Sequence, residues 1–129
     1  MRKLFEVLNP DSVFHAASII DLRPYPVPSL DQINVEATRS LLELSKESSL
    51  CNDKLTKFVY TSTIECGYSN NECINVDETM PYPSKPSNGY QRTKIEAEKL
   101  VLAANDGESG LKTAALRPAH IFGQVRACD

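Results

Sequence analysis

The chain has 129 residues, enough for one modest domain or part of a larger one. Hydrophobic residues make up 41% and charged residues 24%, which is typical of a folded globular protein and excludes a disordered chain. The 14 basic and 17 acidic residues give a net charge of -3, so there is no positive excess for nucleic acid. No apolar run approaches the roughly 20 residues of a membrane span. We therefore expect a cytoplasmic protein that binds no nucleic acid.

The first half of the chain alternates between helical and extended patterns. Apolar residues in 1–8 recur at helical spacing, and Pro10 closes that segment. The short apolar run 12–18 fits a strand buried on both faces. Three prolines make 22–28 an extended connector. From Ser29, a plausible helix cap, apolar positions keep the helical period to about residue 48.

The second half repeats this alternation. Residues 57–63 are rich in aromatic and β-branched residues and end in three hydroxyl side chains, which indicates a second buried strand. A loop too long for a simple connection follows over 65–88, and a helix is expected over 89–105 with Gly107 as its stop. Residues 113–118 predict a third strand that ends at a proline.

Strands that alternate with helices predict an α/β protein with a parallel sheet and helices on both faces. Ligands bind such sheets at the carboxyl ends of the strands. Polar segments at Ser18, 61–63 and 118–123 follow the three expected strands. We therefore expect these three segments to form one candidate site.

The four cysteines form no C-x-x-C pair and have no histidine at the spacing of a zinc site. We expect reduced thiols and no metal site, in agreement with a reducing compartment. The cysteines are Cys51, Cys66, Cys73 and Cys128.

Tyr90 and Lys94 are four residues apart in the third expected helix, so they lie on the same face. A tyrosine with a pKa near 10 is a poor acid or base at neutral pH, but an adjacent ammonium lowers that pKa. The pair would then suit general acid-base catalysis, with Thr63 as the hydroxyl that holds a substrate oxygen. Such a pair also arises by chance, so an ordinary helix with a packed tyrosine and a solvated lysine remains the alternative.

Five ordered stretches carry a pattern that is more specific than any one of them. They are VFHAASIID at 13–21, NVEAT at 34–38, FVYTSTIE at 58–65, YQRTK at 90–94 and LRPAHIFG at 116–123. Together they resemble the extended short-chain dehydrogenases/reductases, and most of all the 3β-hydroxysteroid dehydrogenase/isomerase family, related to the sterol-4α-carboxylate 3-dehydrogenases. The resemblance implies part of a Rossmann-like, doubly wound parallel sheet. It leaves open an association of the complete enzyme with membranes.

The resemblance implies roles for individual residues. Tyr90 is expected to be the catalytic acid/base and Lys94 its partner, which also holds the nicotinamide ribose. Thr63 is expected to orient the substrate. Ser62 competes for that role, but strand alternation sends it to the opposite face. Asn34 matches an asparagine that supports the active site, against the alternative of a polar residue on the first turns of a helix.

The cofactor implied by the resemblance is NAD, and NADP is also compatible. Ala16, Ala17 and Ser18 match a strand end that lies against the cofactor ribose, where small side chains allow close approach. Pro118 matches the turn that meets the nicotinamide ring. The substrate class implied is a steroid, a sterol or another small secondary alcohol, which is oxidised to a ketone.

Other polar residues have weaker patterns. We interpret His15 as a buried, hydrogen-bonded residue and not as a ligand. His120 could face a substrate or pack a loop, and Asp21 could belong to a substrate-side loop or form a turn. We expect three charged residues to be solvated on the helix surface, namely Glu96, Glu98 and Lys99.

The sequence departs from the resembling enzymes because it has no Gly-rich turn to hold a pyrophosphate. Its glycines, none of them at the required spacing, are Gly67, Gly89, Gly107, Gly110 and Gly123. We expect residues 1–129 to be a partial NAD(P)-binding domain that lacks the N-terminal Gly-rich turn and the C-terminal substrate lobe.

Two functions stay open at this point. In the first, the chain is a fragment of an NAD(P)-dependent 3β-hydroxysteroid or sterol dehydrogenase and is inactive alone. In the second, it is a non-catalytic protein-interaction module that forms a homo-oligomer through the exposed edge of its first strand.

Overall fold

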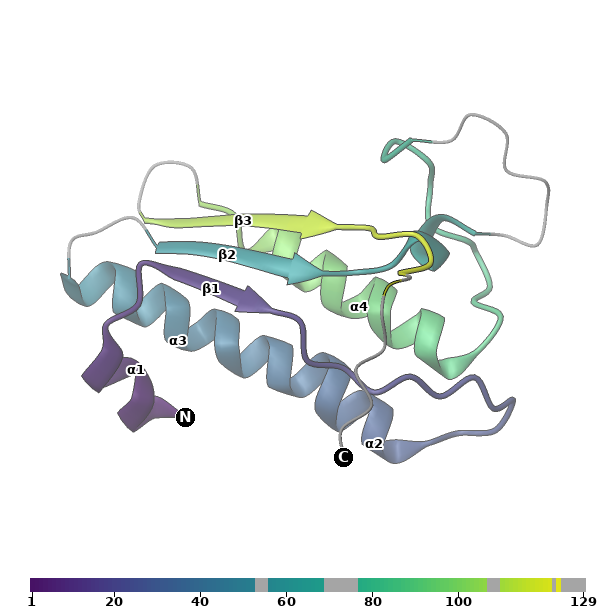
Figure 1. Ribbon diagram of the computed structural model, residues 1–129, viewed down its shortest axis with the longest axis horizontal. Helices are drawn as coiled ribbons and strands as arrows, with labels where there is room; N and C mark the ends of the chain where they lie inside the picture. Colours follow the sequence, from purple (N-terminus) through teal and green to yellow (C-terminus); the bar gives the residue numbers. More distant parts are fainter. Residues whose placement is uncertain (53–55, 69–76, 107–109, 122, 124–129) are drawn as a thin grey trace.

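The computed structural model describes residues 1–52, 56–68, 77–106, 110–121 and 123 (Figure 1). Two of its helical segments depart from α geometry, because η1 is a π-helix and η2 a 3-10 helix. In chain order the elements are α1 (Arg2–Leu8), β1 (Ser12–His15), α2 (Pro28–Leu30), η1 (Asp31–Glu36), α3 (Ala37–Asn52), β2 (Thr56–Thr61), η2 (Ile64–Gly67), α4 (Gly89–Ala103) and β3 (Leu111–Leu116).

Helices α3 and α4 pack on one face of a three-stranded parallel sheet with the order β1-β2-β3 (Figure 1). Val13 lies opposite Phe58, and Phe58 lies opposite Thr113. Parallel strands need crossover connections, which are almost always right-handed. Because both crossovers step across the sheet in the same direction, both helices fall on the same face. The predicted α/β class with a parallel sheet is confirmed.

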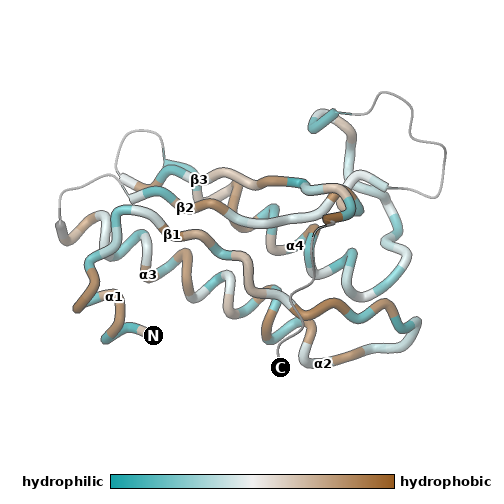
Figure 2. The backbone as a smooth tube through the Cα atoms, viewed as in Figure 1, coloured by the Kyte–Doolittle hydropathy of each residue, from teal (hydrophilic) through white to brown (hydrophobic). Residues whose placement is uncertain are grey.

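The core lies between this face and the two helices. Alternation in β2 buries Thr56, Phe58 and Tyr60 and exposes Lys57 between them. The hydrophobic stretches of the strands lie over the helices (Figure 2). The buried cluster consists of Leu42, Phe58, Tyr60, Ala97, Val101 and Leu111.

The opposite face of the sheet is uncovered in the part of the chain that the structure describes. Phe14 on β1 is 76% exposed, and Leu116 on β3 is 58% exposed. The prediction of helices on both faces is therefore wrong for these residues. Helices reach the second face only where the order of the strands reverses direction, and β1-β2-β3 contains no reversal.

All three strands end earlier than predicted. β1 ends at His15, so the predicted strand residues 16–18 are irregular. β2 ends at Thr61, which leaves Ser62 and Thr63 beyond the regular strand. Hydrophobic patterning places a strand but does not fix its last residue. Residues 111 and 112 belong to β3, which ends at Leu116.

The helices begin and end close to their predicted positions. The long helix starts at Pro28, a residue favoured at the first helical position, so Ser29 is not its cap as predicted. It continues through η1 into α3 and ends at Asn52. Helix α4 begins at Gly89 as predicted and ends at Ala103. The predicted stop at Gly107 lies outside the described residues.

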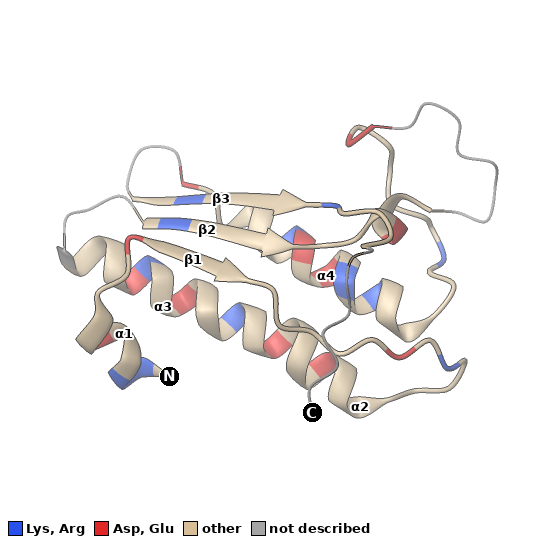
Figure 3. Cartoon of the chain, in the orientation of Figure 1, with Lys and Arg blue, Asp and Glu red and all other residues tan. Residues whose placement is uncertain are grey.

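The surface carries charges of both signs, interspersed along α3 and α4 (Figure 3). None of the described helices combines the length and hydrophobicity that crossing a membrane requires. Cys51 is exposed and Cys66 is buried, and both are free thiols. The other two cysteines, Cys73 and Cys128, lie outside the described residues.

The two faces of the sheet predict different responses to truncation of the same residue type. Phe58→Ala should lower the free energy of unfolding by about 3–5 kcal/mol, because it opens a cavity in the core. Phe14→Ala on the uncovered face should cost less than about 1 kcal/mol. Urea denaturation of the 129-residue chain measures both, and equal losses would contradict the assignment of the faces.

Candidate active site

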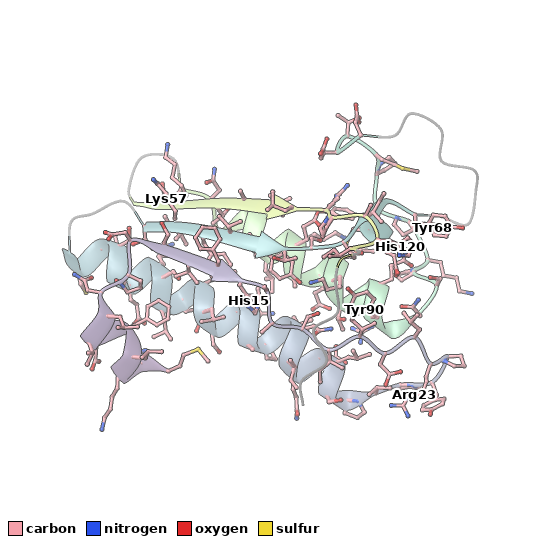
Figure 4. The ribbon with its side chains drawn as sticks, in the orientation of Figure 1. His15, Arg23, Lys57, Tyr68, Tyr90 and His120 are labelled. Atoms are coloured by element: carbon pink, nitrogen blue, oxygen red, sulfur yellow. The ribbon has the colours of Figure 1, made fainter. Side chains whose placement is uncertain are left out.

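Tyr90 and Lys94 lie in the first two turns of α4. The helix begins there because the side chain of Asn88 caps it and accepts a hydrogen bond from the Gln91 amide at 2.8 Å. Tyr90 is 7% exposed and Lys94 is 2% exposed. Tyr90 lies on the same side of the molecule as Tyr68 and His120, beyond the carboxyl ends of the strands, while Lys57 marks the other end of β2 (Figure 4).

The phenol of Tyr90 joins three segments of the chain. The hydroxyl of Thr63, which follows β2, and the hydroxyl of Ser18, which follows β1, both lie close enough to the phenol to lower its pKa. The structure therefore brings together the predicted acid/base, the predicted substrate-orienting hydroxyl and one predicted cofactor-binding residue.

The pKa of Tyr90 is raised above its ordinary value, contrary to the expected lowering by Lys94. Burial is the largest cause, and the Glu65 carboxylate raises the pKa further. Hydrogen bonds with Thr63 and Ser18 offset part of this increase, since they favour the phenolate. Lys94 does not lower the pKa of Tyr90, because its ammonium binds the carbonyl oxygen of Thr61.

Lys94 binds the end of β2. Its Nζ donates a hydrogen bond to the carbonyl oxygen of Thr61 at 2.5 Å and lies 4.4 Å from the ring centroid of Tyr60. Burial lowers the pKa of Lys94 to about 8, and the nearby Cys66 and Glu98 act in the opposite direction. The lysine is thus a buried base that titrates close to physiological pH.

Thr63 and Ser62 have separate environments, as the sequence predicted. Thr63 Oγ1 accepts a hydrogen bond from the Glu65 amide at 3.3 Å and caps η2. Ser62 is buried, and its hydroxyl contacts Cys66 Sγ at 3.3 Å and the Glu98 carboxylate. Of the two, Thr63 is the hydroxyl that acts on the pKa of Tyr90.

Asn34 is buried in η1 and holds the segment after β1 in place. Its Oδ1 accepts from the Ile19 amide at 2.8 Å, and its Nδ2 donates to the Ile19 carbonyl at 2.9 Å. Nδ2 also reaches Thr93 Oγ1 on α4 at 3.1 Å. Asn34 is 1% exposed and lies on the first turns of the long helix, so its support of the active site stays a prediction. Asn34 acts on the position of Ser18 through its neighbour Ile19.

The residues predicted to bind the cofactor suit one end of a dinucleotide. Ala16 and Ala17 are exposed directly after β1 and present only methyl groups, which permits close approach. Pro118 accepts a hydrogen bond from the Ile64 amide at 3.0 Å and so lies beside the end of β2. Ser18, Tyr90 and Lys94 supply polar groups between these two segments. This donor set suits a ribose and its attached ring, and it contains no cradle for a pyrophosphate.

A cleft of about 600 Å³ opens beside Thr63. Its apolar wall includes Leu22, Ile64 and Met80, and three carboxylates line it from the segments after β2. The described residues contain no cluster of three or more side chains suited to a metal ion. The full lining is Leu22, Thr63, Ile64, Glu65, Gly67, Tyr68, Asp77, Glu78, Met80, Ser87, Asn88, Arg117, Pro118, Ala119 and His120.

Two residues at the site were missed by sequence reasoning. Glu98 was expected to be solvated but is 1% exposed and hydrogen-bonded, so that expectation is wrong, whereas Glu96 is exposed as expected. Gln91, also 1% exposed, donates to the carbonyl oxygens of Glu65 at 2.6 Å and Tyr68 at 2.8 Å. The signal for Glu98 was its spacing, since 90, 94 and 98 share one helix face.

The two histidines and Asp21 also have defined places. His15 is buried and its Nε2 lies 2.8 Å from Thr38 Oγ1, so the interpretation as a hydrogen-bonded core residue is confirmed. Because Thr38 Oγ1 donates to the Asn34 carbonyl, it accepts from His15. His120 is exposed and lines the cleft. Asp21 forms a turn with Arg23, whose Nε donates to it at 2.8 Å.

The fold and this cluster have counterparts in known proteins. The profile of the 3-beta hydroxysteroid dehydrogenase/isomerase family matches residues 2–128. A sterol-4-alpha-carboxylate 3-dehydrogenase of Candida albicans is 36% identical over 88% of this chain and 30% of its own length. A 3-beta-hydroxysteroid dehydrogenase of Mycolicibacterium neoaurum is 35% identical over 92% of this chain and 32% of its own length. The chain thus spans about a third of these relatives.

A solved structure extends the likeness to three dimensions. MoeE5 in complex with UDP-glucose and NAD superposes with a TM-score of 0.67 and 28% identity, over 84% of this chain and 34% of that protein. A parallel sheet with a hydroxyl cluster at its carboxyl ends defines the class as a Rossmann-like short-chain dehydrogenase/reductase fold. Within that class, the chain belongs to the 3-beta hydroxysteroid dehydrogenase/isomerase family.

The electrostatics of the cleft predict the behaviour of Tyr90. Glu65→Gln should lower the pKa of Tyr90 toward its ordinary value, because a charge that opposes the phenolate is removed. NMR titration of ¹³C-labelled tyrosine measures it, with Glu96→Gln on the exposed side of α4 as the control. An unchanged Tyr90 pKa in Glu65→Gln would refute the cause assigned here.

Proposed function

We propose that this chain is the catalytic segment of an NAD-dependent dehydrogenase that oxidises a 3β-hydroxysteroid or sterol to a ketone. The observation that carries the proposal is the convergence of Tyr90, Thr63 and Ser18 at the carboxyl ends of the strands, where both hydroxyls act on the phenol. Membership of a family named for this reaction supports it.

In the proposed reaction, Tyr90 acts as the phenolate, takes the proton of the substrate hydroxyl and releases it to solvent after the hydride has left. Thr63 orients that hydroxyl, because its own hydroxyl lies close enough to Tyr90 to act on the phenol. Lys94 supplies the positive charge of the site as long as the pH is below its pKa of about 8. NAD, when bound, would accept the hydride from the substrate carbon that bears this hydroxyl. The products are the ketone, the reduced cofactor and one proton.

We propose that Ala16, Ala17, Ser18, Pro118 and Lys94 hold the ribose and nicotinamide end of the cofactor. The NAD complex of MoeE5 supports NAD as the cofactor, and NADP is also compatible with these residues. The sequence of this chain has no Gly-rich turn. We therefore propose a partial domain, whose phosphate cradle and substrate lobe belong to other parts of the same protein.

The charge of the cleft bears on the substrate. Glu65, Asp77 and Glu78 line it, and the Arg117 guanidinium is already paired with Glu98 at 2.6 Å. A carboxylate on the substrate, next to the reacting hydroxyl, would be repelled by these three carboxylates of the cleft. This favours an uncharged 3β-hydroxysteroid over a sterol 4-carboxylate.

Replacement of the proposed acid/base tests the function directly. Tyr90→Phe should lower kcat by at least about 100-fold, because the proton acceptor is lost while the ring still packs. The assay follows reduction of NAD with a 3β-hydroxysteroid, using the longest open reading frame that encodes this chain. Tyr25→Phe, on an exposed loop, is the matched control and should retain wild-type turnover. Full turnover in Tyr90→Phe would rule out the proposed role.

A second candidate function rests on the edge of the sheet. Among the described residues β1 pairs only with β2, so its other edge has unpaired backbone groups. Two copies could join these edges about a two-fold axis in a non-catalytic interaction module. Light scattering of the purified 129-residue chain, without nucleotide, should then give twice its 14.3 kDa mass. A monomer at all concentrations would exclude this alternative.

A further inference from the structure

Glu98 is a carboxylate buried at the point where three segments of the chain meet. It lies on the same face of α4 as Tyr90 and Lys94, and it is 1% exposed. Tyr82 OH donates to its Oε1 at 2.9 Å. Arg117 donates to the same oxygen through Nε at 3.0 Å and Nη2 at 2.6 Å, and Ser62 Oγ donates to Oε2.

These donors keep Glu98 ionised in a buried place. Burial alone would raise the pKa of Glu98, but the hydrogen bonds from Arg117, Ser62 and Tyr82 outweigh it and leave the pKa below its ordinary value. An unpaired buried carboxylate would be strongly unfavourable, so the donors are bound firmly to it. Glu98 therefore fixes the positions of the segments that carry them.

Two of the donors directly precede residues of the candidate site. Ser62 stands before Thr63, and Arg117 stands before Pro118. The backbones of these two segments are also paired, because the Ser62 amide donates to the Leu116 carbonyl at 2.7 Å. The Glu98 carboxylate thus binds the segments that follow β2 and β3 to α4, the helix that carries Tyr90.

Glu98 also acts on the charge of Lys94. Its negative charge opposes the effect of burial and raises the pKa of Lys94. Cys66 acts in the same sense, and His15 and the Tyr60 ring also face the ammonium. The titratable and charged groups that face Glu98 itself are Arg117, Tyr82, Cys66, Tyr60 and Lys94.

We infer that Glu98 is a positioning residue for the proposed dehydrogenase, which rests on the function proposed above. Through Arg117 and Ser62, it holds Pro118 and Thr63 beside Tyr90. Its negative charge also favours the charged form of Lys94. Glu98 touches neither substrate nor cofactor in this role, and it acts through the residues that do.

The first test needs no catalytic activity. NMR titration of the lysine side chains should give a lower pKa for Lys94 in the Glu98→Gln variant than in the wild-type 129-residue chain, because a charge that raises this pKa is removed. Glu98→Asp keeps the charge and should leave the pKa of Lys94 closer to wild type. Glu96→Gln, on the exposed side of the same helix, is the matched control and should leave Lys94 unchanged. A Lys94 pKa that is the same in Glu98→Gln as in wild type would overturn the inference.

The second test uses the longest open reading frame that encodes the chain. Glu98→Gln should lower kcat on the order of 10- to 100-fold with little change in KM, because the reacting groups are displaced while the cleft remains. It should also shift the pH profile of kcat. An unshifted profile with full kcat would count against positioning by Glu98.

The two tests separate this inference from the proposed function. The protein encoded by the reading frame could lack dehydrogenase activity while the pKa of Lys94 still falls in Glu98→Gln. That result would refute the proposed function and retain the coupling of Glu98 to Lys94. If Glu98→Gln does not fold, Arg117→Lys provides a second variant, because it retains the charge and loses the paired hydrogen bonds to Oε1. Full kcat in folded Arg117→Lys would overturn the positioning role.

Discussion

Backbone polar groups at the carboxyl ends of parallel strands need partners once the strands stop pairing, and α4 supplies them here. Lys94 binds the carbonyl of Thr61, and Gln91 binds the carbonyls of Glu65 and Tyr68. Glu98 binds the side chains that follow β2 and β3. The inner face of α4 is polar near its start for this reason. The groups that complete the backbone are thus also the groups from which the candidate site is built.

Satisfying these groups by burial changes their acid-base properties. Burial lowers the pKa of Lys94 to about 8 and raises the pKa of Tyr90. Lys94 therefore loses its proton more easily than a lysine in water does, and Tyr90 loses its proton less easily than a tyrosine in water does. Hydrogen bonds from Thr63 and Ser18 act against the increase at Tyr90. The acid-base properties of Tyr90 therefore depend on hydroxyl groups that follow two strand ends.

Sequence patterns predicted much of this arrangement, since parallel strands must deliver their carboxyl ends to one edge. Periodicity and motif order predict the three strands and the shared helix face of Tyr90 and Lys94. Strand alternation also predicts that Thr63 and Ser62 have separate environments. The coverage of the sheet could not be predicted, because it depends on the order of the strands in space. Glu98 was missed because a charged residue on a helix is normally solvated, and its partner Arg117 is 19 positions away. Tertiary contacts decide such cases.

We infer that the buried Glu98 carboxylate holds the ends of β2 and β3 on α4. Amide hydrogen exchange tests it most directly, because the Ser62 and Ile64 amides donate to Leu116 and Pro118 across this junction. In Glu98→Gln, protection of both amides should fall on the order of tenfold relative to the Thr56 amide, which binds Gly110 at the other end of β2. Equal changes at all three amides, or none at Ser62 and Ile64, would contradict the claim.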